Sequence, residues 1–223
     1  MASVRLWKEG DTPQCIKVLR EASWSNVWPS YILTIKKRWF SQVTGLSAVG
    51  CYLVTNSAIL FVFSILVVFF TTLVLQVLGN MFYIYFHLRD MHHVEKEYFS
   101  NPDSCFLVAE VKFDDIPPVI VGTIAIVRRA SDSNTAWLRR MAVLNAFRGY
   151  GIGQLLVGKA IQFSSRRKYN KIMLITTEVH KAARALYTKM GFKVRNYKPY
   201  SYVGGWVKIW TYEMECDLVN PEG

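Results

Sequence analysis

A long uncharged stretch constrains the fold of this chain more than any other feature of its sequence. Fifty consecutive residues, from Trp39 to Leu88, contain no Lys, Arg, Asp or Glu. The most apolar part, Ala58 to Leu78, has 21 residues, enough for a helix that spans a bilayer. A buried core helix of a soluble protein is the alternative, but uncharged runs of about 18 or more residues favour a membrane segment.

The length of the stretch also predicts how it folds. Fifty helical residues would extend about 75 Å, which is too long for one crossing of a hydrocarbon core about 30 Å thick. The most polar interruption is Thr55-Asn56-Ser57, where we expect a turn. The sequence therefore predicts a transmembrane or re-entrant helical hairpin over residues 39–88, between residues 1–38 and residues 89–223.

Positive charge is concentrated in a different part of the chain. The whole chain has 27 Lys and Arg residues against 16 Asp and Glu, a formal net charge of +11. Residues 128–208 hold 17 of these cations and only two acids, Asp132 and Glu178. A solvated basic face is one explanation. An excess of this size argues more for an anionic partner such as nucleic acid, lipid headgroups or a phosphorylated cofactor.

A glycine-rich loop inside this basic segment is a candidate phosphate site. Residues 138–144 have the character of a strand, and Arg148-Gly149-Tyr150-Gly151-Ile152-Gly153 follows. Apolar residues then recur at helical spacing to about residue 165. In such an arrangement, backbone N–H groups approach phosphate closely and the helix N-terminus adds its positive dipole end. The residues alone leave these three anionic partners open.

Two common nucleotide motifs do not fit this loop. A dinucleotide-binding fingerprint needs Gly or Ala where this chain has Leu156, and an acid further downstream. A Walker loop needs Ser or Thr to ligate magnesium, where this chain has Ala160. The pattern Arg148-x-x-Gly151-x-Gly153 instead resembles the pyrophosphate loop of the GCN5-related N-acetyltransferases.

A second motif and the order of elements extend this resemblance to nearly the whole chain. Ala183-x-x-Leu186-Tyr187-x-x-x-Gly191-Phe192 resembles a helix and cap of the same family. Further segments resemble its elements in order: 4–21 a first strand and helix, 90–98 a second helix, then strands at 103–110, 120–128 and 171–177. A hydrophobic block between the first two helices is similar to the membrane-anchored N-acetyltransferase 8, or camello-like, branch.

The resemblance implies a fold and a reaction. The fold would be α+β, a mixed and mostly antiparallel sheet flanked by helices, with the hairpin inserted into it. The reaction would be acetyl transfer from acetyl-CoA to the amine of a small amino-acid-type acceptor, either aspartate-like or a cysteine S-conjugate. The resemblance also implies that the basic segment is the electrostatic seat of this phosphorylated cofactor, with no nucleic acid partner. Two alternatives stay open: a protein-lysine acetyltransferase of the secretory route, and a non-catalytic membrane adaptor with a basic face.

The resemblance also assigns roles to residues. Tyr187 would be the general acid, and Glu178 or His180 the base, unless water relays the proton. Backbone around Met141, Ala142 and Val143 would hold the pantetheine arm and polarise the thioester carbonyl. The pyrophosphate would be bound by Arg148 and by the amides of Gly149, Tyr150, Gly151, Ile152 and Gly153.

Two further assignments come from the residues themselves. Arg139 and Arg140 point to opposite faces of their strand, so at most one faces the acceptor. Arg140 is the candidate for an acceptor carboxylate, with a structural ion pair as the alternative. We expect no metal site, because the four cysteines and the histidines His87, His92 and His93 match no metal-ligand spacing.

The order of the segments predicts a membrane topology. If residues 4–21 belong to the catalytic fold, both flanks of the apolar block lie in one compartment, so the block crosses an even number of times. Lys36-Lys37-Arg38 before the block and Arg89 after it favour the cytosol for both flanks. The expected location is the endoplasmic reticulum membrane, with the catalytic residues facing the cytosol and the lipid bilayer as a partner.

Overall fold

The computed structural model describes residues 2–114, 117–129, 132–202 and 207–218. They form two compact units, one of residues 1–22 with 88–223 and one of residues 23–87. The sequence prediction instead divided the chain after residues 38 and 88. The residues that account for this difference, 23–38, are described with the second unit.

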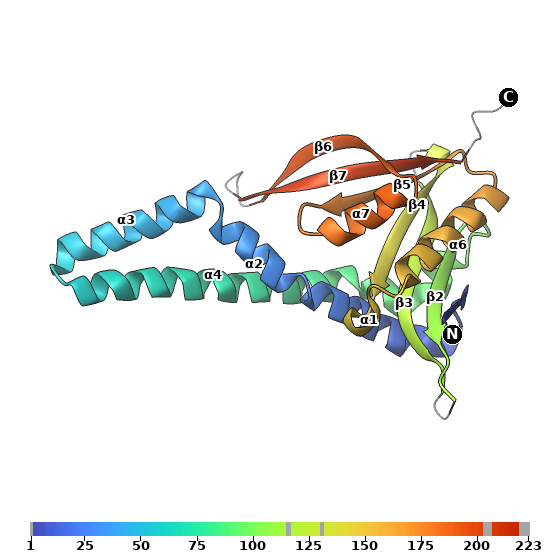
Figure 1. Cartoon of the computed structure of the whole chain (residues 1–223), viewed down its shortest axis with the longest axis horizontal. Helices are drawn as coiled ribbons and strands as arrows, with labels where there is room; N and C mark the ends of the chain where they lie inside the picture. Colours follow the sequence, from blue (N-terminus) through green and yellow to red (C-terminus); the bar gives the residue numbers. More distant parts are fainter. Residues whose placement is uncertain (1, 115–116, 130–131, 203–206, 219–223) are drawn as a thin grey trace. The chain divides into compact units, whose positions relative to one another are not determined.

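The first unit contains a seven-stranded sheet in the order β1-β2-β3-β4-β5-β7-β6 (Figure 1). Only the β4–β5 pair is parallel, and the other neighbours are antiparallel. The expected mixed, mostly antiparallel sheet is therefore confirmed. The strands are β1 (Ala2–Leu6), β2 (Cys105–Val111), β3 (Val119–Arg129), β4 (Asp132–Val143), β5 (Lys171–Thr177), β6 (Lys193–Tyr202) and β7 (Val207–Asp217).

Helices flank this sheet. They are η1 (Glu9–Asp11), α1 (Thr12–Trp24), η2 (Arg89–His93), α5 (Val94–Tyr98), η3 (Asn145–Phe147), α6 (Ile152–Arg166) and α7 (Lys181–Lys189). Consecutive residues of β2 and β3 are buried, so both faces of these apolar central strands are covered. Side chains from α1, α5 and α6 complete the core, among them Val18, Tyr98 and Leu156.

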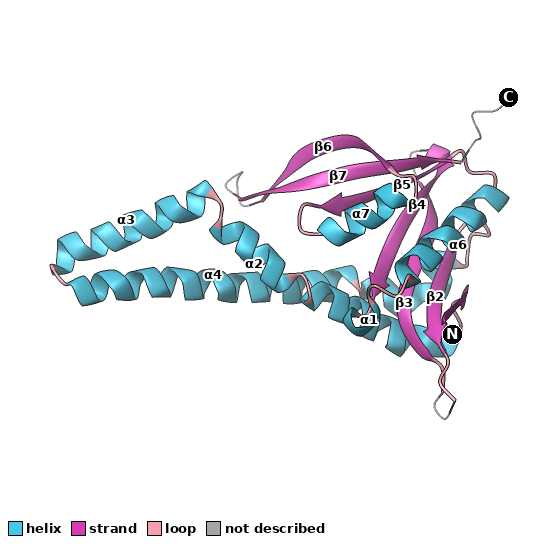
Figure 2. Ribbon diagram, in the orientation of Figure 1, coloured by secondary structure: helices cyan, strands magenta, loops and turns pink. Residues whose placement is uncertain are grey.

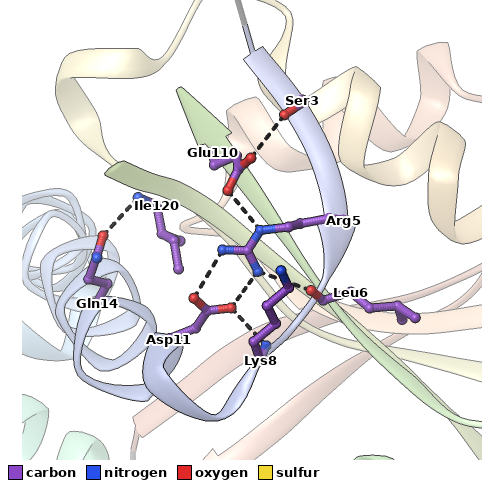
Figure 3. A network of polar contacts seen from close by, with 8 residues as sticks. All are labelled: Ser3, Arg5, Leu6, Lys8, Asp11, Gln14, Glu110 and Ile120. Atoms are coloured by element: carbon purple, nitrogen blue, oxygen red, sulfur yellow. Dashed lines mark hydrogen bonds and ion pairs between the residues drawn. The ribbon is translucent and has the colours of Figure 1, made fainter. Parts of the chain in front are cut away.

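The N-terminal residues are tied to the sheet by a polar network (Figure 3). Strand β1 pairs antiparallel with β2. From β1, the Arg5 guanidinium donates to Glu110 of β2 at 2.7 Å and to Asp11 of η1 at 2.6 and 3.0 Å. Gln14 of α1 accepts a hydrogen bond from the backbone N–H of Ile120 in β3. Residues on both sides of the apolar block therefore build one sheet and one core.

The second unit contains the helical hairpin. Helices α3 (Arg38–Thr55) and α4 (Ala58–His87) lie side by side and are joined by a short turn (Figure 2). Asn56 ends α3 in the left-handed region, with φ 50°, and its N–H donates to the carbonyl of Tyr52. The turn expected at Thr55-Asn56-Ser57 is therefore confirmed.

Helix α4 has the length and composition of a membrane span. Its 30 residues extend about 45 Å, comparable to a bilayer with its headgroups. Its most apolar 18-residue window has a mean hydropathy of 2.9, and none of that window is buried. Large apolar side chains such as Leu66 and Phe70 are exposed on it, as Leu46 and Leu53 are on α3.

A further helix, α2 (Val27–Ile35), belongs to this unit and was not expected. The Tyr31 hydroxyl donates to the carbonyl of Phe69 in α4, and Ser23 donates to Asn80. These contacts attach residues 23–35 to the hairpin rather than to the sheet. The sequence boundary followed the charge run at Lys36, whereas the packing changes earlier in the chain.

Candidate active site

Strands β4 and β5 begin as a pair and then separate. They are paired only at Thr135 with Lys171, Ala136 with Ile172 and Trp137 with Met173. Beyond these positions β4 continues to Val143 and β5 to Thr177 without further register between them. Backbone N–H and C=O groups on facing edges of separated strands are available to a bound chain. Met141, Ala142 and Val143, the predicted pantetheine site, lie on this part of β4.

A β-bulge lies where β4 leaves β5. The register with β3 runs from Ala125–Arg139 to Thr123–Ala142, so Arg140 and Met141 together oppose Ile124. Arg140 has a φ of 54°, in the left-handed region that is unusual for a residue with a side chain. Its carbonyl accepts a hydrogen bond of 2.8 Å from the buried Thr123 hydroxyl. Such bulges redirect the backbone and are frequent beside active sites.

The side chain of Arg140 is held in an ion pair. Its Nε and Nη2 donate to Oδ2 of Asp90 at 2.9 and 2.8 Å, and the Tyr98 hydroxyl donates to the same oxygen. Only 11% of the Arg140 side chain and 16% of the Asp90 side chain are exposed. Burial opposes the charge on Arg140, but Asp90 outweighs it, so the pKa of Arg140 is raised. The ion-pair alternative is therefore present, and the contact of Arg140 with an acceptor stays a prediction.

The glycine loop between β4 and α6 has the backbone of an anion site. Gly149 and Gly151 have φ values of 87° and 79°, which favour glycine. Gly151 precedes α6, so the N–H groups of Ile152 and Gly153 begin a helix and have no acceptor within it. The exposed Arg148 side chain donates from Nε to the carbonyl of Val143 at 3.1 Å. Tyr150, also predicted to contribute its amide, is exposed.

Gly153 is required for a different reason. A Cβ atom at this position would lie 2.9 Å from Leu186 Cδ2 and 3.4 Å from Met141 Cε. The absence of a side chain therefore lets the first turn of α6 lie against α7 and the β4 bulge. The structure thus brings the predicted pyrophosphate loop, the predicted pantetheine strand and the helix of Tyr187 together.

Tyr187 is packed inside this cluster of elements. It lies in α7, is 5% exposed, and its ring centroid is 5.6 Å from that of Phe192. Burial disfavours the phenolate and raises the pKa of Tyr187. The hydroxyl therefore keeps its proton at neutral pH, as a proton or hydrogen-bond donor must.

The two candidate bases follow β5. His180 Nδ1 lies 3.2 Å from the Thr177 hydroxyl and 3.4 Å from that of Thr176. Burial, followed by the charges of Arg184 and Arg148, lowers the pKa of His180, so the imidazole is neutral at pH 7. Glu178 is held against β7: its Oε1 accepts from the backbone N–H of Trp210 at 3.4 Å. His180 thus has the protonation state of a base and contacts the end of β5, whereas Glu178 contacts β7.

An arginine and several aromatic rings lie beside these bases. Tyr197 stacks on Trp210 with centroids 4.4 Å apart and contacts Tyr212 at 4.7 Å. Arg184 lies 4.3 Å over the Tyr212 ring and donates to the carbonyl of Thr177. Arg184 was not among the site residues predicted from the sequence, although it lies inside the motif from Ala183 to Phe192 that carries the family resemblance.

Asp90 and Tyr98 were also missed as partners of the site. In the sequence Asp90 lies between His87 and His92, histidines for which the spacing predicted no metal site. In the part of the chain that the structure describes, no group of three or more His, Cys, Asp or Glu is arranged to hold a metal ion.

The basic segment is divided between two places. Several of its cations gather where β4 begins: Arg128, Arg129, Arg166, Arg167, Lys168 and Lys171. The glycine loop follows the opposite end of β4. Arg128 and Arg129 also lie 3.7 and 3.8 Å from Asp103 and Glu213. Only part of the positive charge of the basic segment, including Arg148, therefore lies at the loop. The described part of the segment does not form one continuous basic surface around the predicted cofactor site.

The chain is similar in sequence to a known protein family and to several of its members. The model of the acetyltransferase (GNAT) family matches residues 73–192, a range that includes each predicted site residue. N-acetylaspartate synthetase of Xenopus tropicalis is 38% identical over 104 residues, 47% of this chain and 36% of that protein. The probable N-acetyltransferase camello of Xenopus tropicalis is 32% identical over 105 residues, 47% of this chain and 46% of that protein. For human N-acetyltransferase 8B the identity is 32% over 104 residues, 47% of this chain and 45% of that protein. The matched stretch thus spans less than half the length of these relatives.

Solved structures share the fold at low identity. An acetyltransferase of the GNAT family from Staphylococcus aureus has a TM-score of 0.55 at 16% identity, covering 98% of this chain and 100% of that one. The ribosomal-protein-S18-alanine N-acetyltransferase of Escherichia coli has a TM-score of 0.53 at 12% identity, covering 100% and 98%. At these identities the likeness concerns the arrangement of helices and strands.

Proposed function

Because the chain belongs to the acetyltransferase (GNAT) family, we propose that it is a membrane-anchored N-acetyltransferase that uses acetyl-CoA as donor. One observation carries the proposal: β4 separates from β5 immediately before a glycine loop whose helix, α6, begins against α7. This arrangement offers unpaired backbone groups for an extended arm and helix N–H groups for a diphosphate, and coenzyme A has both in its pantetheine arm and its pyrophosphate.

The residues present fit this donor. Arg148 and the amides from Gly149 to Gly153 would bind the pyrophosphate, since positive φ at Gly149 and Gly151 and the start of α6 leave N–H groups free to face an anion. Backbone N–H groups of Met141 to Val143 would bind the pantetheine arm and the thioester carbonyl oxygen. No metal is part of the proposed reaction.

The acid and base would act on the two sides of the thioester carbon. The acceptor amine attacks this carbon, a C–N bond forms, and the C–S bond breaks. Neutral His180 would accept the proton that the amine loses, with Glu178 as the second candidate. Tyr187 would donate to the leaving sulfur. A thiol with a pKa of about 8.5 is a stronger acid than tyrosine, and burial weakens Tyr187 further as an acid, so complete proton transfer is uphill. The hydroxyl would therefore act mainly by donating a hydrogen bond that stabilises the developing thiolate.

We propose a small amino-acid-type acceptor, aspartate-like or a cysteine S-conjugate. The relatives named N-acetylaspartate synthetase, at 36% to 38% identity, support the first class. A protein lysine of the secretory route is the alternative acceptor. An acceptor carboxylate would need a cation. Arg184 is the candidate beside β5, because Arg140, the residue predicted from the sequence, is already paired with Asp90.

An acetyl-transfer screen with the detergent-solubilised full chain tests the proposal. The amines are aspartate, cysteine S-conjugates and lysine peptides, and the readout is free coenzyme A together with the mass of the acetylated product. Arg148→Gln serves as the negative control, because it should weaken acetyl-CoA binding. Turnover with aspartate or a conjugate is the expected result, whereas turnover confined to lysine peptides would select the alternative acceptor. A chain that neither binds nor consumes acetyl-CoA would be the membrane adaptor.

The membrane part of the proposal concerns α3 and α4. We propose that this hairpin is embedded in the endoplasmic reticulum membrane and that the first unit faces the cytosol. Exposed apolar side chains along both helices support insertion into lipid. The flanking cations Lys36, Lys37, Arg38 and Arg89 support the cytosolic side.

A further inference from the structure

The bulge in β4 is strained at its centre. Arg140 adopts a φ of 54° although glycine would occupy this region at far lower cost. Residues with side chains keep such a conformation only when their surroundings determine it, and these positions concentrate at functional sites.

Contacts to both the carbonyl and the side chain of Arg140 fix this conformation. Thr123, which is fully buried, holds the Arg140 carbonyl from β3 at 2.8 Å. Asp90 holds the guanidinium through two hydrogen bonds from η2, and Tyr98 of α5 holds Asp90 in turn. The second oxygen of Asp90, Oδ1, is buried without a hydrogen-bond partner among the described residues. Asp90 thus accepts the hydrogen bonds of both Arg140 and Tyr98 at a single oxygen, Oδ2.

The next residues are those assigned to the thioester. Met141 follows Arg140 directly, and its Cε lies 3.4 Å from the position that a Cβ on Gly153 would occupy. Arg140 therefore reaches toward η2 and α5, while Met141 lies against the start of α6. A change in the backbone at Arg140 would rotate the amides of Met141, Ala142 and Val143 that follow it.

We propose that Asp90 and Arg140 form a positioning pair that holds the β4 bulge, so that the amides after it point at the thioester carbonyl of acetyl-CoA. This inference rests on the proposed function. In it Arg140 acts through the backbone and does not touch the acceptor. Polar contacts of this kind do not touch the substrate but hold the groups that do in their productive orientation.

Variants of the pair test this role in the full chain in detergent. Asp90→Asn keeps the size of the side chain and Arg140→Lys keeps the positive charge, but both break the paired geometry, since Asn lacks the carboxylate charge and Lys the planar fork of Arg. Tyr98→Phe removes one hydroxyl and is the mildest change if the other variants fold poorly. Asp103→Asn is the matched control, because it breaks the Arg128–Asp103 ion pair beside the start of β4.

The measurements separate positioning from binding. We expect Asp90→Asn and Arg140→Lys to lower kcat about 10- to 100-fold, somewhat less than the loss of a direct oxyanion donor. The acetyl-CoA Kd and the acceptor KM should change less than about threefold, a range too small to account for that loss. The carbonyl 13C resonance of bound acetyl-CoA, labelled at that carbon, should move toward its value in water, because the thioester is less polarised. Tyr98→Phe should give a smaller shift in the same direction, and Asp103→Asn none.

Other results overturn the proposal. If Arg140→Lys raises the acceptor KM and leaves the 13C resonance unchanged, Arg140 binds the acceptor instead. If the variants lose only thermal stability while kcat and the resonance stay at the wild-type values, the pair is merely structural. Failure of the wild-type chain to bind acetyl-CoA would overturn the proposed function as well, and the wild-type measurement alone reveals that case.

Discussion

At the scale of single residues, a buried tyrosine hydroxyl allows a direct test of the chemistry. Tyr187→Phe removes only an oxygen, and the ring contact with Phe192 is kept. We expect kcat to fall about 100-fold, the lower range for loss of a general acid, with little change in the acetyl-CoA Kd. Stopped-flow turnover and equilibrium binding measure these two quantities.

Tyr169→Phe is the control for this variant. Tyr169 is equally buried, but its hydroxyl donates to the carbonyl of Asp103, beside the start of β4. Its loss should cost about 1 kcal/mol of stability and leave kcat unchanged. A Tyr187→Phe enzyme with wild-type kcat would remove the acid role from this residue.

The lowered pKa of His180 predicts how activity depends on pH. A base must be neutral, and burial with the charges of Arg184 and Arg148 keeps the folded-state pKa of His180 below its ordinary 6.5. The acidic limb of kcat/KM should therefore fall below pH 6.5 and disappear in His180→Asn, with kcat reduced about 100-fold. The unfolded chain binds this proton more readily, so the same group makes the fold less stable as pH falls through 6.5. An unchanged acidic limb in His180→Asn would assign the base to Glu178 or to water, and the exposed His92 provides the control variant His92→Asn.

At the scale of elements, two glycines of the loop and helix α6 respond in opposite ways to the same substitution. Gly151→Ala places a side chain at a φ of 79°, which costs about 1 kcal/mol and distorts the loop. Gly158→Ala lies in the interior of α6, where a Cβ would meet only Met190 Cε at 3.9 Å, and should stabilise the fold by about 0.5–1 kcal/mol. We expect Gly151→Ala to raise the acetyl-CoA Kd at least several-fold and Gly158→Ala to leave it unchanged. Equal Kd values for the two variants would argue against the pyrophosphate loop.

The network that ties β1 to β2 should dominate stability at this end of the sheet. Arg5→Ala would leave Asp11 and Glu110, with 12% and 10% of their side chains exposed, without their cation. Breaking such a pair costs about 3 kcal/mol, whereas Arg128→Ala, with 45% of its side chain exposed, should cost far less. Thermal and urea unfolding of the two variants measure the difference. Equal midpoints would show that β1 is held by its backbone pairing alone.

The same network predicts an acid-sensitive fold. Burial alone would raise the pKa of Asp11, but the hydrogen bond from Arg5, aided by the Lys8 N–H, lowers it overall. The carboxylate therefore adds stability above its unfolded pKa of about 4 and loses it as pH falls through the folded value. Arg5→Ala should flatten this part of the stability profile.

The sequence predicted elements better than contacts. Strand β5 has the predicted bounds, because an apolar and β-branched run between polar residues reads directly as a strand. The turn at Asn56 was visible because three polar residues interrupt an apolar run. The β4 bulge was not visible, because a left-handed Arg140 depends on Asp90, fifty positions earlier in the chain. Helix α2 was missed because residues 27–35 precede the charge run at Lys36 in the sequence and were therefore assigned to the sheet. Only their packing on α4 assigns them to the hairpin.

At the scale of the whole molecule, the strand pairing constrains the membrane topology. Strand β1 pairs with β2 in one sheet, yet the chain between them contains the complete hairpin. A folded sheet cannot be divided by a bilayer, so if the hairpin is embedded in a membrane, as we propose, both of its ends lie on the same side. Helix α3, with 18 residues, extends about 27 Å, close to the hydrocarbon thickness, and α4 exceeds it. Two crossings are therefore the arrangement that satisfies both the sheet and the lengths of the helices.

Glycosylation tags test this arrangement in cells. One acceptor tag is placed at each terminus and one on a long flexible loop inserted at Asn56-Ser57, each in a separate variant. We expect modification only of the inserted loop, because the cations before α3 and after α4 favour the proposed cytosolic side for the flanks. An unmodified loop together with unmodified termini would make the hairpin re-entrant. Modification of both termini would keep the even number of crossings but place the site in the lumen, and modification of one terminus would contradict the pairing of β1 with β2 in the membrane-bound protein.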